Sequence, residues 1–439
     1  MEVKPVARMP GTVQEILRRL EGAGHEAWCV GGAVRDLLLG REPGDWDVTT
    51  SAVPEVVLAL FAPRALPTGL QHGTVTVDHV EITTYRRDGT YSDCRRPDRV
   101  EFTGSLEEDL SRRDFTVNAM ALDLRGTLLD PFGGQADLEN RVLRAVGDPE
   151  RRFQEDALRI LRGLRFAACL GLAPEPGTAQ SLMQNRLLLK EIAPERIGAE
   201  LMKLLCGPHA PAVLREYAPV MGVFWPEVLP MVGFDQRNVH HCYDVWEHSL
   251  RALEAVPGDP VLRCAALLHD IGKPSAFTLD GRGVGHFYGH AAISCELAEG
   301  MLRRLRVSTG FRERVVRLVE WHDREIPRTD RGLRRALRLL GEEDLRLLLC
   351  LKRADNLAQA PAYRGRQTEI DRAEQILDRL LAEDACFSLR QLAVRGDDLL
   401  ALGLRGPAVG KALDMLLNRV IDGELPNERA ALLEFVTKP

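Results

Sequence analysis

The sequence has no long hydrophobic run, and its cysteines stand apart from one another. No apolar stretch approaches the roughly 18–20 residues that a membrane-spanning helix requires. The opening residues, MEVKPVARMP, lack the apolar segment of a secretory signal. The nine cysteines form no CxxC pair, so neither a zinc-finger pattern nor a disulfide framework is indicated. We therefore expect a cytoplasmic protein whose cysteines are reduced.

Lysine is also scarce. Of the 58 basic residues only seven are lysine and 51 are arginine, while the net charge is −6. A negative net charge disfavours binding of nucleic acid through the overall field of the protein. Arginine nevertheless offers a planar fork that suits phosphates and base edges, so its local clusters matter more than the total. A genome rich in G and C would also raise the arginine content, and composition alone leaves both explanations open.

The length of 439 residues, with 45% hydrophobic and 28% charged residues, is typical of a folded protein of about three domains. In the first third, helices are expected at 13–20 and 34–39 and strands at 27–30, 45–48, 73–77 and 80–85. Strand signals stop beyond residue 137, and helical spacing then dominates 154–170, 193–205 and most of 245–385. The pattern predicts an α+β fold with a small mixed sheet followed by a helical body.

A glycine pair and a pair of carboxylates lie close together in the first third. Gly31 and Gly32 fall between an expected strand and an expected helix, where backbone N–H groups can approach a polyphosphate, although such a pair is more often only a tight turn. Asp45 and Asp47 are at strand spacing, so both would point to one face about 6.6–7 Å apart. Their mutual repulsion would be relieved by Mg²⁺ shared with a substrate phosphate. Together these features favour a metal site for phosphoryl transfer.

Five segments within about residues 28–205 resemble, in order and spacing, the motifs of the class II tRNA nucleotidyltransferases, the family of CCA-adding enzymes and bacterial poly(A) polymerases. The first comprises VGGAVRDLLLG and DWDVTT. The other four are Ser111–Ala119, Asp130–Gly134 with Asp137, Glu155–Arg159, and Glu195–Ile197 with Glu200 and Leu201. The stretch from Asp397 to Asn427 is also similar to family members, so the resemblance covers nearly the whole chain.

The resemblance implies a polymerase β-like nucleotidyltransferase head at residues 1–145, a helical neck with base-binding and RNA-binding motifs at 146–235, an HD-like helical domain at 236–385 and a tail domain at 386–439. It implies addition of CCA to the tRNA 3′ end from CTP and ATP without a template, with Mg²⁺ as the cofactor. It implies neither a membrane nor a protein partner.

The resemblance also implies roles for individual residues. Asp45 and Asp47 would hold two Mg²⁺ ions about 3.5–4 Å apart. Glu81 is a candidate third carboxylate, although a charge on an alternating strand more often faces solvent. The triphosphate and sugar would be held by Gly31, Gly32, Arg35, Arg113, Asp114 and Asn118. Arg113 and Asp114 could alternatively form only a surface ion pair.

Asp156 and Arg159 would be i and i+3 neighbours on one helix, which places acceptors beside donors. Cytosine and adenine each carry an exocyclic amine next to a ring-nitrogen acceptor, whereas guanine and uracil carry an oxygen there. This predicts that CTP and ATP are used in preference to GTP and UTP by about 10²-fold or more. Arg162 and Arg165, further along, would reach phosphates or the primer, or would form a solvated face.

The segment from Arg86 to Glu101, RRDGTYSDCRRPDRVE, is dense in charge and turn residues. It predicts a mobile loop. In related enzymes a loop at this place helps to switch the site from C to A, so its presence favours full CCA addition over CC addition.

His248, the pair His269 and Asp270, and Asp355 occur in the order His, His-Asp, Asp, which resembles the HD superfamily of metal-dependent phosphohydrolases. Imidazoles and carboxylates from separate helices can converge on one divalent transition metal. His290 and the pair His322 and Asp323 would extend such a site to a second metal. The alternative is that the HD region is a scaffold without activity of its own.

Four arginines, Arg331, Arg334, Arg335 and Arg338, fall on one side of an expected helix and form either a phosphate track for tRNA or a solvated face. Three other functions stay open. The chain could be a poly(A) polymerase, although it lacks a basic C-terminal extension. It could add only CC or only A. It could also be an HD phosphohydrolase whose head senses nucleotides.

Overall fold

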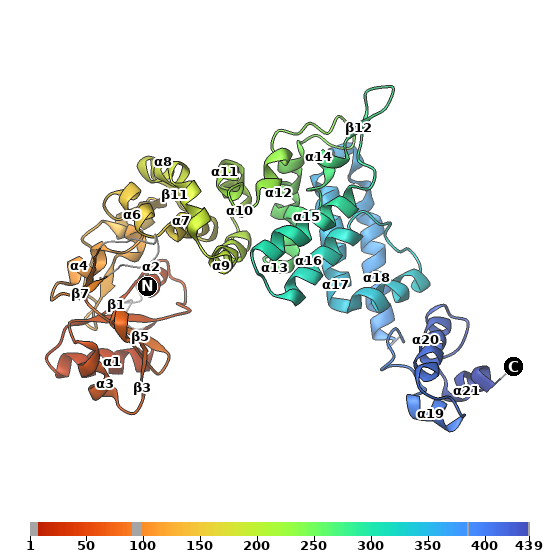
Figure 1. The fold of residues 1–439 in the computed structure, drawn as a ribbon, viewed down its shortest axis with the longest axis horizontal. Helices are drawn as coiled ribbons and strands as arrows, with labels where there is room; N and C mark the ends of the chain where they lie inside the picture. The colour runs from red at the N-terminus through yellow and green to blue at the C-terminus, as the bar shows by residue number, and fades with distance from the viewer. Residues whose placement is uncertain (1–7, 90–98, 384–385, 438–439) are drawn as a thin grey trace. The chain divides into compact units, whose positions relative to one another are not determined.

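The computed structural model describes residues 8–89, 99–383 and 386–437 (Figure 1). The chain forms two compact units, the first ending at Leu229 and the second beginning at Pro230. Within the described ranges no helix combines the length and the apolar composition that crossing a bilayer needs. None of the cysteines described forms a disulfide. The expected α+β class is confirmed, whereas the division into four domains stays a prediction.

A seven-stranded sheet of order β3-β4-β5-β2-β1-β8-β9 forms the centre of the first unit. Its strands are β1 (Ala27–Val30), β2 (Asp47–Thr50), β3 (Ala65–Gly69), β4 (Thr74–Val77), β5 (Val80–Thr84), β8 (Ala121–Leu122) and β9 (Leu128–Leu129). The central pair, β2 and β5, is parallel, while β1 and β2 are antiparallel, so the sheet is mixed. Asp78 and His79, both at positive φ, join β4 to β5 as the expected hairpin.

The strand expected at 45–48 is shifted toward the C-terminus. β2 begins only at Asp47, and Asp45 lies in a bend before it. Pro43 and Gly44 precede this bend, and proline and glycine both favour turns over strands. The prediction that Asp45 and Asp47 are related by the pleat of one strand is therefore wrong.

Helices and short strands surround the sheet in the first part of this unit. They are α1 (Gly11–Gly22), α2 (Gly32–Leu38), α3 (Pro54–Phe61), η2 (Leu70–His72), β6 (Arg86–Asp88), β7 (Val100–Phe102), α4 (Leu106–Ser111), η3 (Thr116–Asn118) and α5 (Gly134–Glu139). The start of α5 packs tightly on η3, because a Cβ at Gly134 would lie 2.2 Å from the carbonyl oxygen of Thr116. This contact fixes the turn that carries Asn118.

The segment from Arg86 to Glu101, expected to be a mobile loop, has paired strands at both of its ends, so the expectation is wrong there. β6 and β7 form an antiparallel ribbon, with Arg86 opposite Phe102. The central part of the expected loop, residues 90–98, lies outside the described residues.

The rest of the first unit has six α-helices and a 3-10 helix among its described residues: α6 (Pro149–Glu155), α7 (Leu158–Leu170), α8 (Pro176–Gln184), η4 (Arg186–Glu191), α9 (Pro194–Leu205), α10 (Ala210–Glu216) and α11 (Ala218–Met221). The expectation that strands end at residue 137 is wrong in detail. β10 (Val142–Leu143) pairs in parallel with β11 (Ala173–Pro174), and two-residue strands leave no alternation in the sequence.

The helix expected at 154–170 is also broken. Asp156 adopts an extended conformation (φ −140°, ψ 102°) between α6 and α7. Its carboxylate accepts a hydrogen bond of 3.1 Å from the backbone N–H of Leu158, near the start of α7. An aspartate that satisfies the first N–H groups of a helix in this way separates two helices rather than continuing one.

The second unit is helical. It contains η5 (Pro226–Met231, which begins in the first unit), α12 (Val245–Ala255), α13 (Pro260–Leu268), α14 (Lys273–Ala276), the strand pair β12 (Thr278–Leu279) and β13 (Gly285–His286), α15 (His290–Arg304), α16 (Thr309–Trp321), α17 (Asp330–Ala358), η6 (Pro361–Arg366), α18 (Gln367–Ala382), α19 (Gly396–Ala401), α20 (Pro407–Ile421) and α21 (Arg429–Thr437). The last three helices bury an apolar core of their own, which includes Leu399, Leu416 and Leu432.

The arginines expected to form a phosphate track lie on α17 and are engaged within the second unit. Arg331 and Arg335 both donate to Asp422, at 2.8–2.9 Å, and Arg338 donates to Asp414 at 3.0 Å. Ion pairs from α17 to the tail thus occupy three of the four side chains, so the predicted open track is not observed.

Candidate active site

A cavity of about 830 Å³ lies in the first unit, and the residues that the sequence predicts for nucleotide transfer line it, except the candidate third carboxylate Glu81, which is exposed. They are Gly31, Gly32, Arg35, Asp45, Asp47, Arg113, Asp114, Asn118, Asp156, Arg159, Arg162 and Arg165. Their positions come from the sheet, from η3 and from α7. The structure therefore brings the predicted set together, while the role of each residue stays a prediction.

One end of the cavity gathers carboxylates. In the parallel pair of β2 and β5, Asp47 lies directly opposite Glu81, and Asp45 precedes it by two residues. Burial raises the pKa of Asp47, and Glu81 and Asp45 raise it further, against the opposing effect of Arg113. Carboxylates crowded in this way favour a hard cation such as Mg²⁺, which accepts oxygen ligands and relieves the repulsion.

Gly31 leaves this end open. Its φ is +74°, which side chains rarely adopt, and a Cβ there would lie 3.0 Å from Nη1 of Arg113 and 3.6 Å from Oδ2 of Asp47. Any larger residue would therefore occupy the space between the carboxylate and the guanidinium. The turn therefore leaves room for a group that contacts both the Asp47 carboxylate and the Arg113 guanidinium.

A chain of hydrogen bonds connects the glycine turn to α7 through η3. Arg35 donates to Oδ1 of Asn118 (2.7 Å), Asn118 donates to Oδ1 of Asp114 (3.1 Å), and Arg162 donates to Oδ2 of Asp114 (2.8 Å). Burial would raise the pKa of Asp114, but Arg162 and the Asn118 amide outweigh it and hold this pKa well below its usual range. Asp114 is therefore ionised, and the ion pair is part of the wall of the cavity.

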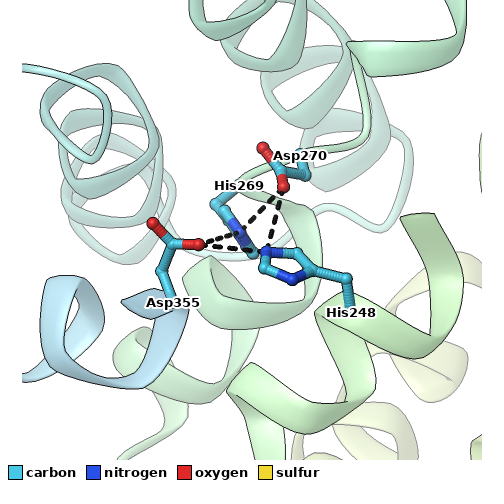
Figure 2. A group of neighbouring side chains, drawn as sticks. All are labelled: His248, His269, Asp270 and Asp355. Atoms are coloured by element: carbon cyan, nitrogen blue, oxygen red, sulfur yellow. Dashed lines mark hydrogen bonds and ion pairs between the residues drawn. The ribbon is translucent and has the colours of Figure 1, made fainter. Parts of the chain in front are cut away.

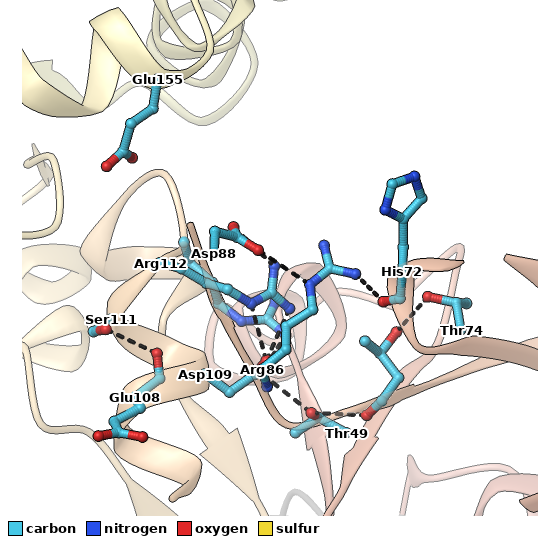
Figure 3. Close-up of polar contacts among 12 residues, drawn as sticks. Thr49, His72, Thr74, Arg86, Asp88, Glu108, Asp109, Ser111, Arg112 and Glu155 are labelled. Carbon is cyan, nitrogen blue, oxygen red and sulfur yellow. Dashed lines mark hydrogen bonds and ion pairs between the residues drawn. The ribbon is translucent and has the colours of Figure 1, made fainter. Parts of the chain in front are cut away.

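Asp109 contacts both arginines of the second motif, Arg112 and Arg113, and sequence reasoning missed it. Figure 3 shows Asp109 next to Arg112. It is fully buried, accepts hydrogen bonds from Arg112 at 2.8 and 3.0 Å and from Thr49 at 3.1 Å, and lies 3.7 Å from Arg113. Its place three and four residues before the arginines was the available signal, but it lies in an acidic run, LEEDL, that is typical of an exposed helix.

The residues expected to read the base are both at the cavity but on different elements. Arg159, near the start of α7, donates to Glu155 (2.8 Å) and to the carbonyl oxygen of Arg112 (2.9 Å). Asp156, between the helices, accepts a hydrogen bond of 3.4 Å from Arg196 of the fifth motif. The prediction that one helix carries both is wrong: the Arg159 guanidinium pairs with Glu155 and the Asp156 carboxylate pairs with Arg196, although both residues line the cavity.

Phe166 was also missed. Three arginines of the cavity, Arg35, Arg162 and Arg165, lie 4.3–5.4 Å from its ring centre, and its edge meets Phe115. An aromatic face stabilises a nearby cation. Each of these arginines is also paired with a carboxylate, which is Asp36, Asp114 and Glu200 respectively. An aromatic residue in an apolar helix normally indicates core, and the sequence gives no further signal.

The predicted HD residues converge in the second unit (Figure 2). His248 comes from α12, His269 and Asp270 follow α13, and Asp355 comes from α17. Nε2 of His248 lies 3.0 Å from Oδ1 of Asp355 and 3.3 Å from Oδ2 of Asp270, and Nε2 of His269 lies 3.2 Å from the same oxygen of Asp270. One ligand atom from each of these four residues falls within 4.8 Å of all the others, as around a metal ion.

The chemistry of this donor set fits a divalent transition metal. Burial would lower the pKa of His269, but Asp270 and Asp355 outweigh it and raise this pKa to about 10. Nδ1 of His269 lies 2.8 Å from the carbonyl oxygen of Ala266 and Nδ1 of His248 lies 3.3 Å from that of Ala358, which is the usual second contact of a metal-binding imidazole. Both Nε2 atoms consequently face the carboxylates.

Three family models match the chain. They are the poly(A) polymerase head domain over residues 27–144, the "probable RNA and SrmB-binding site of polymerase A" over residues 171–218, and the HD domain over residues 238–360. With the mixed sheet and the cavity, these matches define a nucleotidyltransferase that carries an HD domain.

The CCA-adding enzyme of Geobacillus kaustophilus is 36% identical over 435 residues, 96% of this chain and 95% of that enzyme. For the CCA-adding enzyme of Geobacillus stearothermophilus, identity is 52% over 203 residues, 45% of this chain but only half of the relative. A crystal structure of the Bacillus stearothermophilus CCA-adding enzyme in complex with CTP has a TM-score of 0.70 at 31% identity and covers 99% of this chain and 97% of that one. The chain belongs to the family of CCA-adding enzymes.

Replacing Arg162 with methionine is expected to make the protein less stable toward acid. In the wild type the lowered pKa of Asp114 contributes stability above the ordinary value of about 3.9, and this is lost as the pH falls through the folded-state pKa. Without Arg162, burial raises the pKa of Asp114. The ionised carboxylate then destabilises the folded state at neutral pH, and protonating it no longer lowers the free energy of unfolding. We expect a loss of about 1–3 kcal/mol at pH 7, because Arg162 is one-third exposed, and an acid-unfolding midpoint at higher pH.

Circular dichroism recorded from pH 7 to pH 2 measures this midpoint. The control is Arg18→Met, which removes an exposed arginine of α1 that donates to Gln14. An Arg162→Met midpoint equal to that of the control would show that Asp114 does not depend on Arg162.

Proposed function

We propose that this chain adds CCA to the 3′ end of tRNA from CTP and ATP, without a nucleic-acid template, and that it does so in the cavity of the first unit. The observation that supports this most strongly is the arrangement of charge. Asp45 and Asp47 lie at one end, guanidiniums line the wall, and Asp156 and Arg159 line the cavity at the start of α7. The relatives are named CCA-adding enzymes, and the solved relative that covers the whole chain holds CTP. Because the proposed substrate is tRNA, the proposed place of action is the cytoplasm.

The carboxylate end would hold Mg²⁺ on Asp45 and Asp47, with Glu81 at the strand opposite. Bound there, Mg²⁺ would supply activation of the primer hydroxyl and neutralisation of the triphosphate charge. Gly31 and Gly32 leave room for the phosphates. Arg35 and Arg113 lie next to these glycines. A hydrogen bond to Asn118 holds the Arg35 guanidinium in place.

Base selection would come from Asp156 and Arg159. An exocyclic amine can donate to the Asp156 carboxylate while Arg159 donates to the adjacent ring nitrogen, which both cytosine and adenine permit. Glu155 and the carbonyl oxygen of Arg112 hold Arg159 in place, so the guanidinium does not readily turn to suit a different base. An oxygen in place of the amine would face the carboxylate without a hydrogen bond, and this mismatch is costly in a buried site.

Substituting Asp45 and Asp47 together by alanine should abolish extension of tRNA. Without these carboxylates the triphosphate loses its metal, and we expect the rate to fall by at least about 10³-fold. The assay follows a tRNA transcript that lacks CCA, with CTP and ATP, on a sequencing gel. Glu55→Ala, an exposed carboxylate on α3, is the matched control and should extend normally. Extension by the double variant at the wild-type rate would refute the proposed metal role.

Separate incubation with each triphosphate tests base selection and the number of nucleotides added. We expect transcripts lacking CCA, ending in C and ending in CC to be completed with CTP and ATP, and GTP and UTP to be used about 10²-fold less well or worse. Asp156→Ala should narrow this difference, because the acceptor for the exocyclic amine is lost. Comparable use of all four triphosphates by the wild type would contradict the proposal. Products that stop at CC, or long A tails, would identify a CC-adding enzyme or a poly(A) polymerase.

The second unit supports a second candidate function, metal-dependent hydrolysis of phosphate esters. The supporting observation is the group formed by His248, His269, Asp270 and Asp355, beside a cavity of about 460 Å³ that Lys273 and Arg366 also line. A divalent transition metal bound by this group would supply activation of water and polarisation of the phosphate. Lys273 and Arg366 would bind the phosphate oxygens.

Release of inorganic phosphate from p-nitrophenyl phosphate with Mn²⁺ or Ni²⁺ tests this second function. In the Asp45→Ala, Asp47→Ala background, which removes the transferase ligands, we expect the release to persist. Further substitution of His248 and Asp355 by alanine should reduce it about 10²-fold or more. His286→Ala is the control, because His286 contacts Asp280 outside the group. If no variant releases phosphate with either metal, the proposed hydrolysis is contradicted and the HD group is a scaffold without activity of its own.

A further inference from the structure

One buried aromatic ring, that of Phe166, is shared by arginines from two helices. Phe166 lies on α7 and is only 6% exposed, yet it lines the cavity of the first unit. The guanidinium carbon of Arg165 lies 4.3 Å from the ring centre, that of Arg35 5.2 Å and that of Arg162 5.4 Å. A cation is attracted to an aromatic face within about 6 Å, and such contacts occur roughly once in 70–80 residues. Three of them on one ring single out this position.

The plane of the Phe166 ring is fixed by its neighbours. The fully buried ring of Phe115 packs against it at 83°, with 5.8 Å between the two ring centres. Gly163, one turn earlier on α7, makes room for Phe115, because a Cβ at Gly163 would lie 2.9 Å from the Cζ atom of that ring. A ring that is packed edge-to-face in this way does not turn freely. It can therefore set the direction of the side chains that lie against it.

Each of the three guanidiniums is also bound by a carboxylate. The pairs are Arg35 with Asp36 at 2.8 Å, Arg162 with Asp114 at 2.6 Å, and Arg165 with Glu200 at 3.0 Å. The three carboxylates lie on different parts of the chain, namely on α2, just before η3 and on α9. The carboxylates thus hold the arginines to separate elements, whereas the ring is a contact that all three arginines share.

This grouping brings like charges close together. Burial lowers the pKa of Arg165, and Arg162 lowers it further, against the opposing effect of Glu200. Crowded guanidiniums are stabilised by an aromatic face and by an anion that accepts their hydrogen bonds. Since all three arginines line the cavity, phosphate groups of the proposed substrate can be that anion.

We propose that Phe166 is a positioning residue for nucleotide binding. The face of its ring holds the three guanidiniums in the orientation that binds the triphosphate. This inference rests on the proposed function and adds a residue that acts through the arginines rather than on the reacting atoms. The guanidiniums would contact the triphosphate both before and during the reaction, so loss of the ring face should raise the KM for CTP and change kcat little.

The competing explanation is that Phe166 only fills space beside α7. Its burial stabilises the fold in either case. A packing role depends on the volume and shape of the ring, whereas attraction of the arginines depends on the negative charge of the ring face. Fluorine atoms on the rim withdraw electron density from the face and change the volume little. Graded fluorination therefore separates the two explanations.

The experiment places mono-, di- and trifluorinated phenylalanine at position 166 of the full chain, and compares them with Phe166→Leu. Calorimetry gives the Kd for CTP with Mg²⁺, and extension of a tRNA transcript that lacks CCA gives KM and kcat. We expect Kd and KM to rise stepwise with fluorination, to about fivefold, and to rise about tenfold in Phe166→Leu, with kcat within about twofold of the wild type.

Phe61 is the matched control. Its ring is fully buried and Arg19 lies 5.2 Å from the ring centre, but neither residue lines the cavity. Fluorination of Phe61 weakens a contact of the same kind elsewhere in the first unit, so its variants should bind CTP as the wild type does.

Equal Kd values across the series at position 166 would overturn the proposal and leave Phe166 as a packing residue, whatever Phe166→Leu does. A fall in kcat with unchanged KM would also overturn it. Because calorimetry does not depend on catalysis, a chain that binds CTP without extending tRNA would contradict the proposed function and still test the ring. A wild type that binds no CTP would overturn both.

Discussion

The first unit depends on the separation of negative and positive charge across one cavity. Asp47 is held partly buried at the start of a central strand with Glu81 beside it, although burial and neighbouring carboxylates both oppose its ionisation. Such a pair is unfavourable by itself and becomes favourable when a cation is bound. Guanidiniums that contact Asp109, Asp114 and Glu155 also line this cavity, and one of them, Arg113, lies beside Asp47. A metal triphosphate is complementary to both ends at once.

The two candidate sites use different ligand chemistry within one chain. Oxygen ligands dominate in the first unit, which suits Mg²⁺ and a substrate that brings its own phosphate oxygens. The second combines two imidazoles with two carboxylates, a donor set that suits transition metals held by the protein itself. In both places helix and strand ends present the ligands, so rigid elements fix the direction of each donor while the cavity stays open. Both candidate sites therefore combine metal-binding side chains with an open cavity.

The sequence predicted the α+β class, four of the seven strands of the central sheet, and which of the predicted side chains line each site. Local patterns carried that information, because glycine turns, carboxylate pairs and His-Asp pairs indicate the same chemistry whatever the surrounding fold. The failures came where a tertiary contact or a turn overrode periodicity. Asp156 interrupts an apparently continuous helix by capping the next one, and the turn at Gly44 keeps Asp45 out of its strand. Arg331 and Arg335 have the spacing of an open basic face, yet Asp422, almost 90 residues away, pairs with both.

The central claim is that Asp45 and Asp47 hold a metal where a triphosphate meets α7, and a crystal structure with CTP and Mn²⁺ tests it most directly. Anomalous scattering locates manganese without reference to activity. The account predicts an anomalous peak in contact with both carboxylates and the triphosphate, with the cytosine edge between Asp156 and Arg159. A peak away from Asp45 and Asp47, or a cytosine bound outside the cavity, would contradict it.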